Sequence, residues 1–413
     1  MKRIIVVGGG AAGLMAAYTA AAAGGQVTLL EKMPTVGRKL LITGKGRCNI
    51  TNNCDIATFI KNIPGNGQFL YSALHAFTNQ DIISFFESWG VPVKTERGGR
   101  VFPVSDKARD VVEAFERALV ANKVEIITGQ PVTQIIQKEG KVTGVETKQG
   151  VYEADAVILT TGGASYPGTG SSGDGYLMAR TLGHTIIPLK PSLVPLEVAE
   201  EWIGEVQGLA LKNVSATVLY DGKRQANDFG EMLFTHFGVS GPIILSLSTV
   251  VSDFIQRKES KEILLEINLK PALSPEQLDK RLQRDFTKFA RKQVKNALNE
   301  LLPSSLINPI IDLSHIDPDK PVHQITKSER GRFGWQLQHL TFTITGTRPL
   351  AEAIVTAGGV HTKEIHPGRM ESKLVKGLYF AGEVVDIDGY TGGFNLQAAF
   401  STGYVAGNAA IKE

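Results

Sequence analysis

The fold of this chain is decided near its start, by the ten residues Ile4-Ile5-Val6-Val7-Gly8-Gly9-Gly10-Ala11-Ala12-Gly13. The apolar run Ile4–Val7 is typical of a strand that is buried on both faces. Ala11–Ala23 is rich in helix formers and stops at Gly24-Gly25, and Val27–Leu30 is a second apolar run. A strand, a helix and a second strand in this order form a βαβ unit, which predicts a parallel sheet with a right-handed crossover.

The glycines of this turn match the pattern GxGxxG, and Glu31 follows Gly13 by 18 residues. In a dinucleotide-binding unit, Gly8 permits the tight turn, Gly10 lets the backbone approach a pyrophosphate, and Gly13 lets the helix pack on the strands. The helix N-terminus offers free N–H groups and a positive dipole end to the phosphates. An acid at Glu31 accepts hydrogen bonds from ribose hydroxyls and repels a 2′-phosphate, which favours FAD or NAD over NADP. The cofactor-binding residues predicted here are Gly8, Gly10, Ala11, Ala12, Gly13, Glu31 and Lys32.

The composition is that of an ordinary globular protein, with 42% hydrophobic and 21% charged residues. A length of 413 residues predicts two or three structural units. The formal charge of +3 is too small to indicate a nucleic-acid or membrane partner by itself. Cys48 and Cys54 are the only cysteines. We therefore expect no disulfide framework, no metal site and a reducing, cytoplasmic environment.

The first residues imitate a secretory signal, because Lys2 and Arg3 precede an apolar stretch. Three glycines at Gly8–Gly10 interrupt that stretch, and no clear cleavage site follows it. No later apolar run reaches the roughly 18 residues that a membrane helix needs. We therefore expect neither a leader nor a membrane partner.

The rest of the chain divides into segments of different character. Helices are predicted at 66–90 and 106–121, and strands at 124–128, 132–136, 142–147 and 157–160. From about Pro191, strands are predicted at 193–198, 214–220 and 263–269. Ser274-Pro275-Glu276-Gln277 carries a capping box and begins a helical stretch to about Lys327, whose basic part, Lys280–Lys295, we interpret as a solvated face. Strands return at 340–345 and 378–380, and a closing helix is predicted at 393–410.

This order predicts one cofactor domain made from both ends of the chain. Its parts are residues 1–191 and 356–413. Residues 192–355 form an inserted, β-rich domain with a helical subdomain at about 274–330. The fold class is therefore α/β with an insertion.

Four further segments favour FAD over NAD. Arg38 and Lys39 would screen a pyrophosphate or clamp a ribose, unless they belong to a solvated basic loop. Thr43–Asn52 is polar, glycine-rich and aperiodic, as suits a loop around a ligand, and Cys48 within it either faces the flavin or fills a buried gap. Strands at 155–160 and 377–380 each run into a glycine turn. The residues predicted at the cofactor from these segments are Arg38, Lys39, Gly46, Arg47, Cys48, Asn49, Thr161, Gly162, Gly163, Gly382, Glu383 and Asp386.

Gly168–Gly173 also matches GxGxxG. Pro167 breaks the strand-to-loop context, and no second βαβ unit with a placed acid follows. We interpret this stretch as a loop and helix start of the cofactor domain, not as an NAD site.

These segments resemble the two-dinucleotide-binding-domain flavoproteins, on the side closer to fumarate reductase than to ferredoxin reductase. In that group ATG- and GD-type strand ends flank the FAD, and Glu383 here replaces the usual Asp. More closely, the chain resembles the bacterial NAD(FAD)-utilizing dehydrogenase family, which includes aminoacetone oxidase and a bile-acid-dehydroxylation reductase. The matching runs are GKGRCNITN (Gly44–Asn52), GRVFP (Gly99–Pro103), TGGASYPGTGSSGDG (Thr161–Gly175), GEMLFTHFGVSGP (Gly230–Pro242), TAGGV (Thr356–Val360) and TGGFNLQAAFSTG (Thr391–Gly403).

The resemblance implies a Rossmann-type FAD-binding domain with an inserted β-barrel-like domain that carries a small helical subdomain. It implies that Val132 borders the adenine. It also implies that Gly393, Asn395, Leu396 and Gln397 lie near the isoalloxazine at a helix N-terminus, which would stabilise the anionic reduced ring.

We therefore expect an FAD-dependent oxidoreductase that moves a hydride between a small-molecule substrate and the flavin, with NAD(P)H as a transient electron donor. His236 is the leading catalytic candidate, because an imidazole relays protons near neutral pH, unless it is a structural histidine. Tyr166 and Arg100 are weaker candidates. The alternatives are an amine oxidase that uses O₂, an RNA-modifying flavoprotein, which the near-neutral charge disfavours, and a redox sensor.

Overall fold

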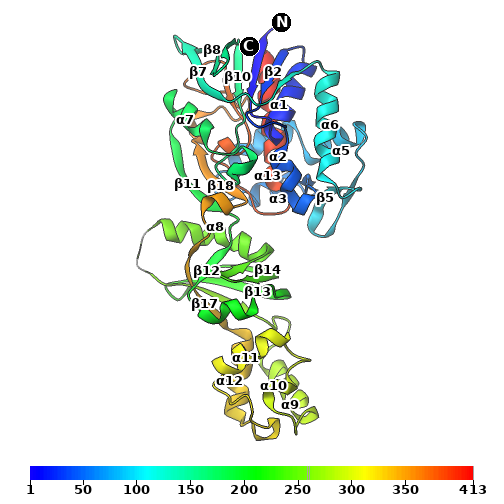
Figure 1. The fold of residues 1–413 in the computed structure, drawn as a ribbon, viewed down its shortest axis with the longest axis vertical. Coiled ribbons are helices and arrows are strands. Elements are labelled where there is room, and N and C mark those ends of the chain that lie inside the picture. Colours follow the sequence, from blue (N-terminus) through cyan, green and yellow to red (C-terminus); the bar gives the residue numbers. More distant parts are fainter. Residues whose placement is uncertain (258, 260, 413) are drawn as a thin grey trace. The chain divides into compact units, whose positions relative to one another are not determined.

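The structure is a computed structural model that describes residues 1–257, 259 and 261–412 (Figure 1). The chain forms two compact units, each with its own hydrophobic core. Unit 1 consists of Met1–Ser192 and the chain from Leu350 onward, and unit 2 of Leu193–Pro349. That each unit folds as an independent domain, with the boundaries predicted above, stays a prediction.

Unit 1 is built on a five-stranded parallel sheet with the order β19-β10-β1-β2-β6. All four residues of the run Ile4–Val7 are buried, as a continuous apolar strand requires. Because β1 lies between β2 and β10, the chain leaves β1 to one side and returns on the other, which is where open α/β sheets place their ligands. The strands are β1 (Arg3–Val7), β2 (Gln26–Leu30), β6 (Glu125–Ile127), β10 (Ala156–Leu159) and β19 (Leu378–Phe380).

Two helices from opposite ends of the chain lie side by side in unit 1. They are α1 (Ala11–Ala22) and α13 (Phe394–Lys412), and α6 (Ala108–Ala121) also packs on α1 (Figure 1). The approach depends on small residues, because a Cβ on Gly407 would lie 2.5 Å from the Ala16 carbonyl oxygen and one on Gly403 would overlap that of Ala12. The first and last helices are therefore locked together.

Smaller elements complete unit 1. One antiparallel sheet contains β7 (Val132–Lys138), β8 (Lys141–Thr147) and β9 (Gly150–Glu153). A second contains β3 (Thr51–Asn52), β5 (Arg100–Pro103) and β4 (Val93–Thr95), and β11 (Ile186–Ser192) pairs with β18 (Val355–Val360). The short helices are α2 (Arg38–Ile42), α3 (Ile56–Lys61), α4 (Tyr71–Ala76), α5 (Asn79–Ser88) and α7 (Asp174–Thr181).

The segment predicted as helical, 66–90, is largely helical and contains two separate helices, α4 and α5. The chain is extended at Phe77, with φ −148° and ψ 99°. Thr78 then caps α5: its side chain accepts from the Asp81 N–H, and the Asp81 carboxylate accepts from the Thr78 N–H. This reciprocal cap restarts the helix, a signal that the apolar periodicity hides.

Unit 2 contains a closed antiparallel barrel with the order β12-β15-β14-β13-β16-β17 (Figure 1). In β16 buried and half-buried residues alternate, as in a strand with one face toward a core. The barrel confirms the predicted fold class, a parallel-sheet domain with an inserted β-barrel-like part. Its strands are β12 (Leu196–Val198), β13 (Ala210–Tyr220), β14 (Lys223–Thr235), β15 (Gly238–Ser240), β16 (Ile263–Asn268) and β17 (Leu340–Thr347), and α8 (Pro242–Gln256) packs on β14.

A helical part of unit 2 follows β16. It contains α9 (Pro275–Lys288), α10 (Val294–Ala297), α11 (Ser304–Leu313) and α12 (Lys327–Gln338). The capping box predicted at Ser274 is present, since Ser274 Oγ accepts from the Gln277 N–H at 3.2 Å and Gln277 Oε1 accepts from the Ser274 N–H at 2.9 Å. Across the described part of the chain, no helix is both long and apolar enough to cross a membrane.

Candidate dinucleotide-binding site

The glycine turn after β1 is forced by close backbone packing. Gly8 has φ +102°, and a Cβ there would lie 2.7 Å from the Thr160 carbonyl oxygen. A Cβ on Gly13 would overlap the Gly8 carbonyl oxygen and lie 2.6 Å from Thr160 Oγ1. These contacts place the N-terminus of α1 at the carboxyl ends of β1 and β10.

The first turn of α1 is open. Among the described residues, a Cβ on Gly10 would meet no atom within 4 Å, and no side chain caps this helix. The first N–H groups of a helix have no partner inside it and carry the positive end of the dipole. Gly10, Ala11 and Ala12 therefore form an uncapped terminus beside free space, which fits the pyrophosphate of a dinucleotide.

Glu31 is fixed beside this turn at the end of β2. Its Oε2 accepts from the Gly9 N–H at 2.6 Å and its Oε1 accepts from the Met33 N–H at 2.8 Å. Each carboxylate oxygen keeps a second lone pair, so the group can still accept from ribose hydroxyls. The Gln130 N–H donates to the Glu31 carbonyl at 2.9 Å. This bond brings the start of β7, and with it Val132, toward the same end of the sheet.

Arg38 supplies an independent test of the fit to an anionic cofactor. Arg38 begins α2, and the start of this helix is attached to the glycine turn because the Gly37 N–H donates to the Gly9 carbonyl at 2.8 Å. The buried Arg38 Nε has no hydrogen-bond partner among the described residues. A buried donor without an acceptor is costly, and a phosphate oxygen is a strong acceptor for a guanidinium. The residues present therefore fit FAD.

Lys39 and Glu383 meet inside unit 1. Lys39 Nζ lies 2.8 Å from Glu383 Oε2 and donates to Ser165 Oγ at 2.8 Å. Glu383 Oε1 accepts from the Thr356 N–H at 2.7 Å. The charge of Lys39 is thus balanced by Glu383, and the pair fastens α2 to the loops that follow β10 and β19.

The loop after β10 is held by its neighbours. Lys32 Nζ contacts Ser172 Oγ and the Asp174 carboxylate, which ties the second glycine-rich stretch to the end of β2. Gly162 has φ +72°, and a Cβ on Gly163 would lie 2.7 Å from Thr356 Cβ. Thr161 Oγ1 is buried and has no partner in the part of the chain that is described. The turn Thr161–Gly163 therefore has no room for larger side chains.

The N-terminus of α13 is held by hydrogen bonds to two loops, one at Asn49–Thr51 and one at Gly389. Gly393 has φ +99°, and a Cβ there would lie 2.8 Å from Thr51 Cα. The Asn49 amide accepts from the Gly393 N–H at 3.0 Å and donates to the Thr51 carbonyl at 3.0 Å. Asn395 accepts from the Gly389 N–H and donates to its carbonyl, each at 2.7 Å. The predicted residues Asn49, Gly393, Asn395 and half-buried Leu396 are thus brought together at one helix terminus.

Two predicted residues have no exposed surface, Cys48 and Gln397. Burial raises the pKa of the Cys48 thiol to about 12, so it stays a neutral thiol. Gln397 Oε1 accepts from Thr51 Oγ1 at 2.7 Å. A direct side-chain contact with a ligand would need the surrounding loop to open. For Cys48 the structure therefore favours the interpretation as a buried filler over one that faces the flavin.

Other predicted residues are engaged within unit 1. Arg47 binds the carboxylates of Glu96 and Asp106, and its guanidinium lies 4.1 Å from the centroid of the Phe102 ring. Gly46 beside it is exposed, and Gly382 donates its N–H to Thr402 Oγ1 at 3.0 Å. Asp386 Oδ2 accepts from Asn66 Nδ2 at 2.9 Å, and burial raises the pKa of Asp386.

The loop Thr43–Asn53 and the hairpin Val93–Lys107 carry a group of cations. We call the basic residues of these two segments the hairpin cluster. These segments hold six basic and two acidic residues, so their net charge of +4 exceeds the +3 of the whole chain. Asn52 Nδ2 donates to the carbonyls of Gly98 and Gly392, each at 3.0 Å, which links the hairpin to the N-terminus of α13. Its exposed cations without an acidic partner in the described chain are Lys45, Arg97, Arg100 and Lys107.

The two catalytic candidates belong to different units. Tyr166 lies in unit 1, on the loop after β10, with φ +51° and 38% of its surface exposed. Its N–H donates to the Ala351 carbonyl at 3.1 Å. His236 lies in unit 2, at an exposed turn between β14 and β15, where its ring centroid is 4.9 Å from that of Phe237. The roles of both stay predictions.

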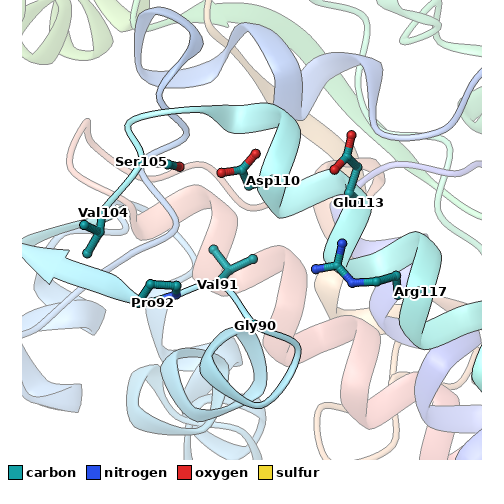
Figure 2. Close-up of a pocket in the computed structure, with 8 residues that line it drawn as sticks. All are labelled: Gly90, Val91, Pro92, Val104, Ser105, Asp110, Glu113 and Arg117. Carbon is teal, nitrogen blue, oxygen red and sulfur yellow. The ribbon is translucent and has the colours of Figure 1, made fainter.

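A hollow of about 380 Å³ lies elsewhere on unit 1, beside α6 (Figure 2). Figure 2 shows that Asp110, Glu113 and Arg117 come from this helix and that Arg117 extends toward Val91. Arg117 Nη2 donates to the Trp89 carbonyl at 2.7 Å. No residue that lines the hollow belongs to the loops at the carboxyl edge of the sheet, so the hollow is separate from the candidate dinucleotide-binding site.

A comparison with protein families assigns the chain, which carries the glycine turn and the fixed acid, to one of them. A sequence model described as the HI0933-like protein Rossmann domain matches residues 2–409. The chain belongs to this family. It is an FAD-dependent oxidoreductase with a Rossmann-type nucleotide-binding fold.

Relatives match over almost the whole chain. A 3-dehydro-bile acid delta(4,6)-reductase of Clostridium scindens is 34% identical over 94% of this chain and 93% of the relative. A ribosomal RNA dihydrouridine synthase of Haemophilus influenzae is 34% identical over 92% of this chain and 90% of the relative. Among solved structures, 3-ketosteroid delta1-dehydrogenase of Sterolibacterium denitrificans matches all of both chains with a TM-score of 0.55 and 13% identity, a likeness of fold alone.

Several residues that build the site are absent from the sequence-based predictions. They include Gly9, which holds Glu31, and Asn66, which holds Asp386. Ser165 and Thr356, which hold Lys39 and Glu383, lie inside the matching runs TGGASYPG and TAGGV. The runs mark the segments, but only the structure shows which polar atoms within them face each other.

Proposed function

We propose that this chain reduces a carbon–carbon double bond that is conjugated to a carbonyl group, with NAD(P)H as the electron donor. The names of the relatives carry the proposal. A 3-dehydro bile acid with double bonds at positions 4 and 6 is a conjugated ketone, and dihydrouridine differs from uridine by two hydrogens across a double bond conjugated to a carbonyl. Both names therefore describe one type of chemistry.

Such a reduction adds a hydride to the β carbon and a proton to the α carbon, while negative charge develops on the carbonyl oxygen. Bound FAD supplies the hydride chemistry. The chain must hold the cofactor, orient the substrate, stabilise the negative charge and supply the proton.

We assign the cofactor grip to the loops at the carboxyl edge of the sheet. The N-terminus of α1 takes the pyrophosphate, Glu31 takes the ribose and Arg38 adds a guanidinium donor. The N-terminus of α13 lies in the clasp of Asn49 and Asn395, and its dipole end favours developing negative charge. The remaining proposed contacts are Gly8, Gly10, Ala11, Ala12, Gly13, Lys32, Lys39, Gly46, Arg47, Val132, Thr161, Gly162, Gly163, Gly382, Glu383, Asp386, Gly393 and Leu396.

We assign proton delivery to Tyr166. It lies on the same loop as Ser165, whose hydroxyl contacts both Lys39 and Glu383. No side-chain hydrogen bond holds its phenol within the described residues, so the hydroxyl is available to a substrate. Its left-handed backbone is uncommon for an aromatic residue, and such conformations cluster at functional sites.

Anaerobic stopped-flow absorbance tests the reaction. The purified yellow protein is mixed with NADH or NADPH, and then with a 3-keto-4,6-diene steroid acid, uridine or a uridine-containing RNA. Bleaching of the flavin by a nicotinamide, followed by its recovery with a conjugated substrate under anaerobic conditions, supports the proposal. Bleaching by aminoacetone and recovery only in air would instead establish an amine oxidase, and bleaching without turnover by any acceptor would indicate a redox sensor.

Separate half-reactions test Tyr166. Tyr166→Phe should leave the bleaching by nicotinamide unchanged and slow the substrate-dependent recovery by about a hundredfold or more, the usual loss for a general acid. His236→Gln is the matched variant in unit 2. If His236→Gln slows recovery and Tyr166→Phe does not, proton delivery belongs to the histidine.

The hairpin cluster favours uridine in RNA as a second candidate for the substrate. Three of its exposed, unpaired cations lie on the hairpin that Asn52 links to the N-terminus of α13, and Lys45 lies on the loop that contains Asn52. Lysine and arginine side chains bind the phosphates of nucleic acids, and this binding weakens as the salt concentration rises. Turnover with RNA but not with the steroid acid would decide for this candidate.

A further inference from the structure

Helix α9 of unit 2 has two faces of opposite character. Leu278, Leu282 and Asp285 are buried, and their spacing of four and three residues defines one side of a helix. Both leucines belong to the core of unit 2. The side of α9 turned away from these residues is left to the solvent.

That outer side carries a line of cations, which we call the basic stripe. Lys280, Arg284 and Lys288 are exposed and recur every four residues, so they follow one another over about 12 Å of helix. Arg291 and Lys292 are also exposed and continue the series just after the helix ends. The basic stripe is defined as these five residues.

Few acids offset the basic stripe. Asp285 lies 3.4 Å from Arg284 but is shared with Arg281 at 3.1 Å, and Glu300 lies 2.7 Å from Lys288. Lys280, Arg291 and Lys292 have no acidic partner among the described residues. Five cations against two carboxylates leave +3, the formal charge of the entire chain. A solvated helix face ordinarily mixes the two signs, so this concentration calls for a polyanionic partner.

An aromatic ring lies within the basic stripe. The Phe289 ring centroid is 4.9 Å from Lys288 Nζ and 4.8 Å from Lys292 Nζ, and the residue is half-buried. Surfaces that bind single-stranded nucleic acid combine cations along the backbone with aromatic rings on which bases stack. A membrane-binding helix instead needs a free apolar face, and the apolar side of α9 is buried in unit 2.

We infer that the basic stripe binds the phosphodiester backbone of RNA and that Phe289 offers a ring to an unpaired base. The inference rests on the proposed function only in its choice of RNA as the polyanion. It assigns to the helical part of unit 2 the work of holding an RNA substrate, while unit 1 carries the flavin.

Fluorescence anisotropy of a labelled RNA hairpin with a uridine-containing loop tests this inference on the full-length, flavin-loaded protein. The test variant is Lys280→Gln/Arg291→Gln/Lys292→Gln, which breaks no ion pair of the described chain. The matched control is Lys138→Gln/Lys148→Gln/Lys212→Gln, which removes three exposed lysines elsewhere and gives the same net charge.

The test variant should bind RNA at least about tenfold more weakly than the wild type, and its plot of log K against log salt should be shallower by about 3. The control variant should bind nearly as the wild type does. Phe289→Leu keeps an apolar side chain against the core and should weaken binding about fivefold or more through lost stacking. Equal losses in the test and control variants, no RNA binding by the wild type, or binding to vesicles of anionic phospholipid in place of RNA would each overturn the inference.

The reaction is measured on the same samples, so the two proposals fail separately. RNA binding through the basic stripe without reduction of any conjugated double bond would leave the inference standing and end the proposed function. Reduction of the steroid acid or of free uridine by a protein that does not bind RNA would support the proposed function and end the inference.

Discussion

Two stretches of unit 1 carry the same glycine spacing and build different structures. In Gly8–Gly13 the turn continues directly from β1, and α1 begins at Ala11, inside the motif. In Gly168–Gly173 the motif begins within a 3₁₀ turn at Pro167–Thr169, and α7 begins only at Asp174, after the motif has ended. The spacing alone therefore does not make a nucleotide site. A preceding strand of the sheet and a helix that starts within the motif do.

The glycines of the two stretches are also required for different reasons. In the first, Gly13 packs against the Gly8 backbone, which cannot move aside, and against Thr160 Oγ1. In the second, a Cβ on Gly168 would meet no atom within 4 Å, and Gly170 is constrained by φ +111° and by the flexible Met33 side chain. The comparison thus predicts different outcomes for Gly→Ala substitutions in the two stretches.

The largest difference is expected at the two ends of the motifs. Gly13→Ala forces a methyl group into the Gly8 carbonyl, which should lower the free energy of unfolding by about 3 kcal/mol and abolish flavin retention. Gly168→Ala should change the free energy of unfolding by less than about 0.5 kcal/mol. Thermal unfolding and the flavin absorbance of the purified proteins measure both. Similar losses in the two variants would show that the second stretch is as tightly packed as the first.

The middle glycines should separate binding from stability. Gly10 has extended φ and ψ and open space around it, so Gly10→Ala should leave the apoprotein as stable as the wild type. The added methyl group meets the pyrophosphate instead, and the Kd for FAD should rise about tenfold or more. Gly170→Ala should destabilise the protein by about 1 kcal/mol, because alanine disfavours a positive φ. Titration of the apoproteins with FAD, with unfolding curves as the control, gives both quantities. Normal FAD affinity in Gly10→Ala would contradict the assigned site.

Substitutions of the acids beside the two stretches should differ less strongly in their effect on the free energy of unfolding. Glu31 is 9% exposed and accepts two backbone N–H groups, so Glu31→Gln should cost about 1.5 kcal/mol. Asp174 is more exposed and pairs with Lys32, so Asp174→Asn should lower the free energy of unfolding by about 0.5 kcal/mol. Urea unfolding of the two variants in parallel measures the difference. Raising the salt concentration should reduce the cost of the Asp174 substitution only.

The smallest effect is expected from pH, at the far end of α7. His184 Nε2 lies 2.8 Å from Ser372 Oγ and Nδ1 lies 3.1 Å from Glu364 Oε2. Burial lowers the pKa of His184 below its usual 6.5, although Glu364 opposes the shift. The opened state therefore binds a proton that the folded state does not, and the stability that neutral His184 provides falls as the pH drops below 6.5.

Hydrogen exchange at pH 7.5 and 5.5, corrected for intrinsic rates, should show that α7 opens more easily at the lower pH while α1 does not. The partner Glu364 stays ionised at both pH values because, although burial opposes the shift, hydrogen bonds from Thr185 and His184 lower its pKa. The variant His184→Gln should remove the difference. An equal change in α1 and α7 would mean that the effect is global rather than tied to this histidine.

Much of unit 1 could be predicted from the sequence because its signals are local. In unit 1 the run Ile4–Val7 indicates its structure within a few residues, and in unit 2 the cap at Ser274 does the same. Long-range pairing gives no such signal. The strand β14, Lys223–Thr235, is largely polar and becomes a strand by pairing with β13, and the prediction omitted it. The helix α8 was omitted too, although Pro242 at its first position is a start signal.

The candidate site shows the same limit. The turn Gly8–Gly13 and the acid Glu31 were predictable, because spacing along one βαβ unit places them. The pairing of Lys39 with Glu383 joins residues 344 positions apart and depends on how three loops meet. Composition also concealed charge. A total of +3 hides both the hairpin cluster and the basic stripe, since acids elsewhere cancel them in the sum.

The pairing of α1 with α13 has a consequence for the order in which the protein is made. The sheet of unit 1 receives β19, and α1 receives its partner helix, only after residues 378–412 have been synthesised. Unit 2 is continuous in sequence and has emerged by then. During translation one side of α1 therefore stays without its partner helix until α13 has been made. We therefore expect flavin to bind only after α13 has been made, because the proposed contacts Gly393 and Leu396 lie at its N-terminus.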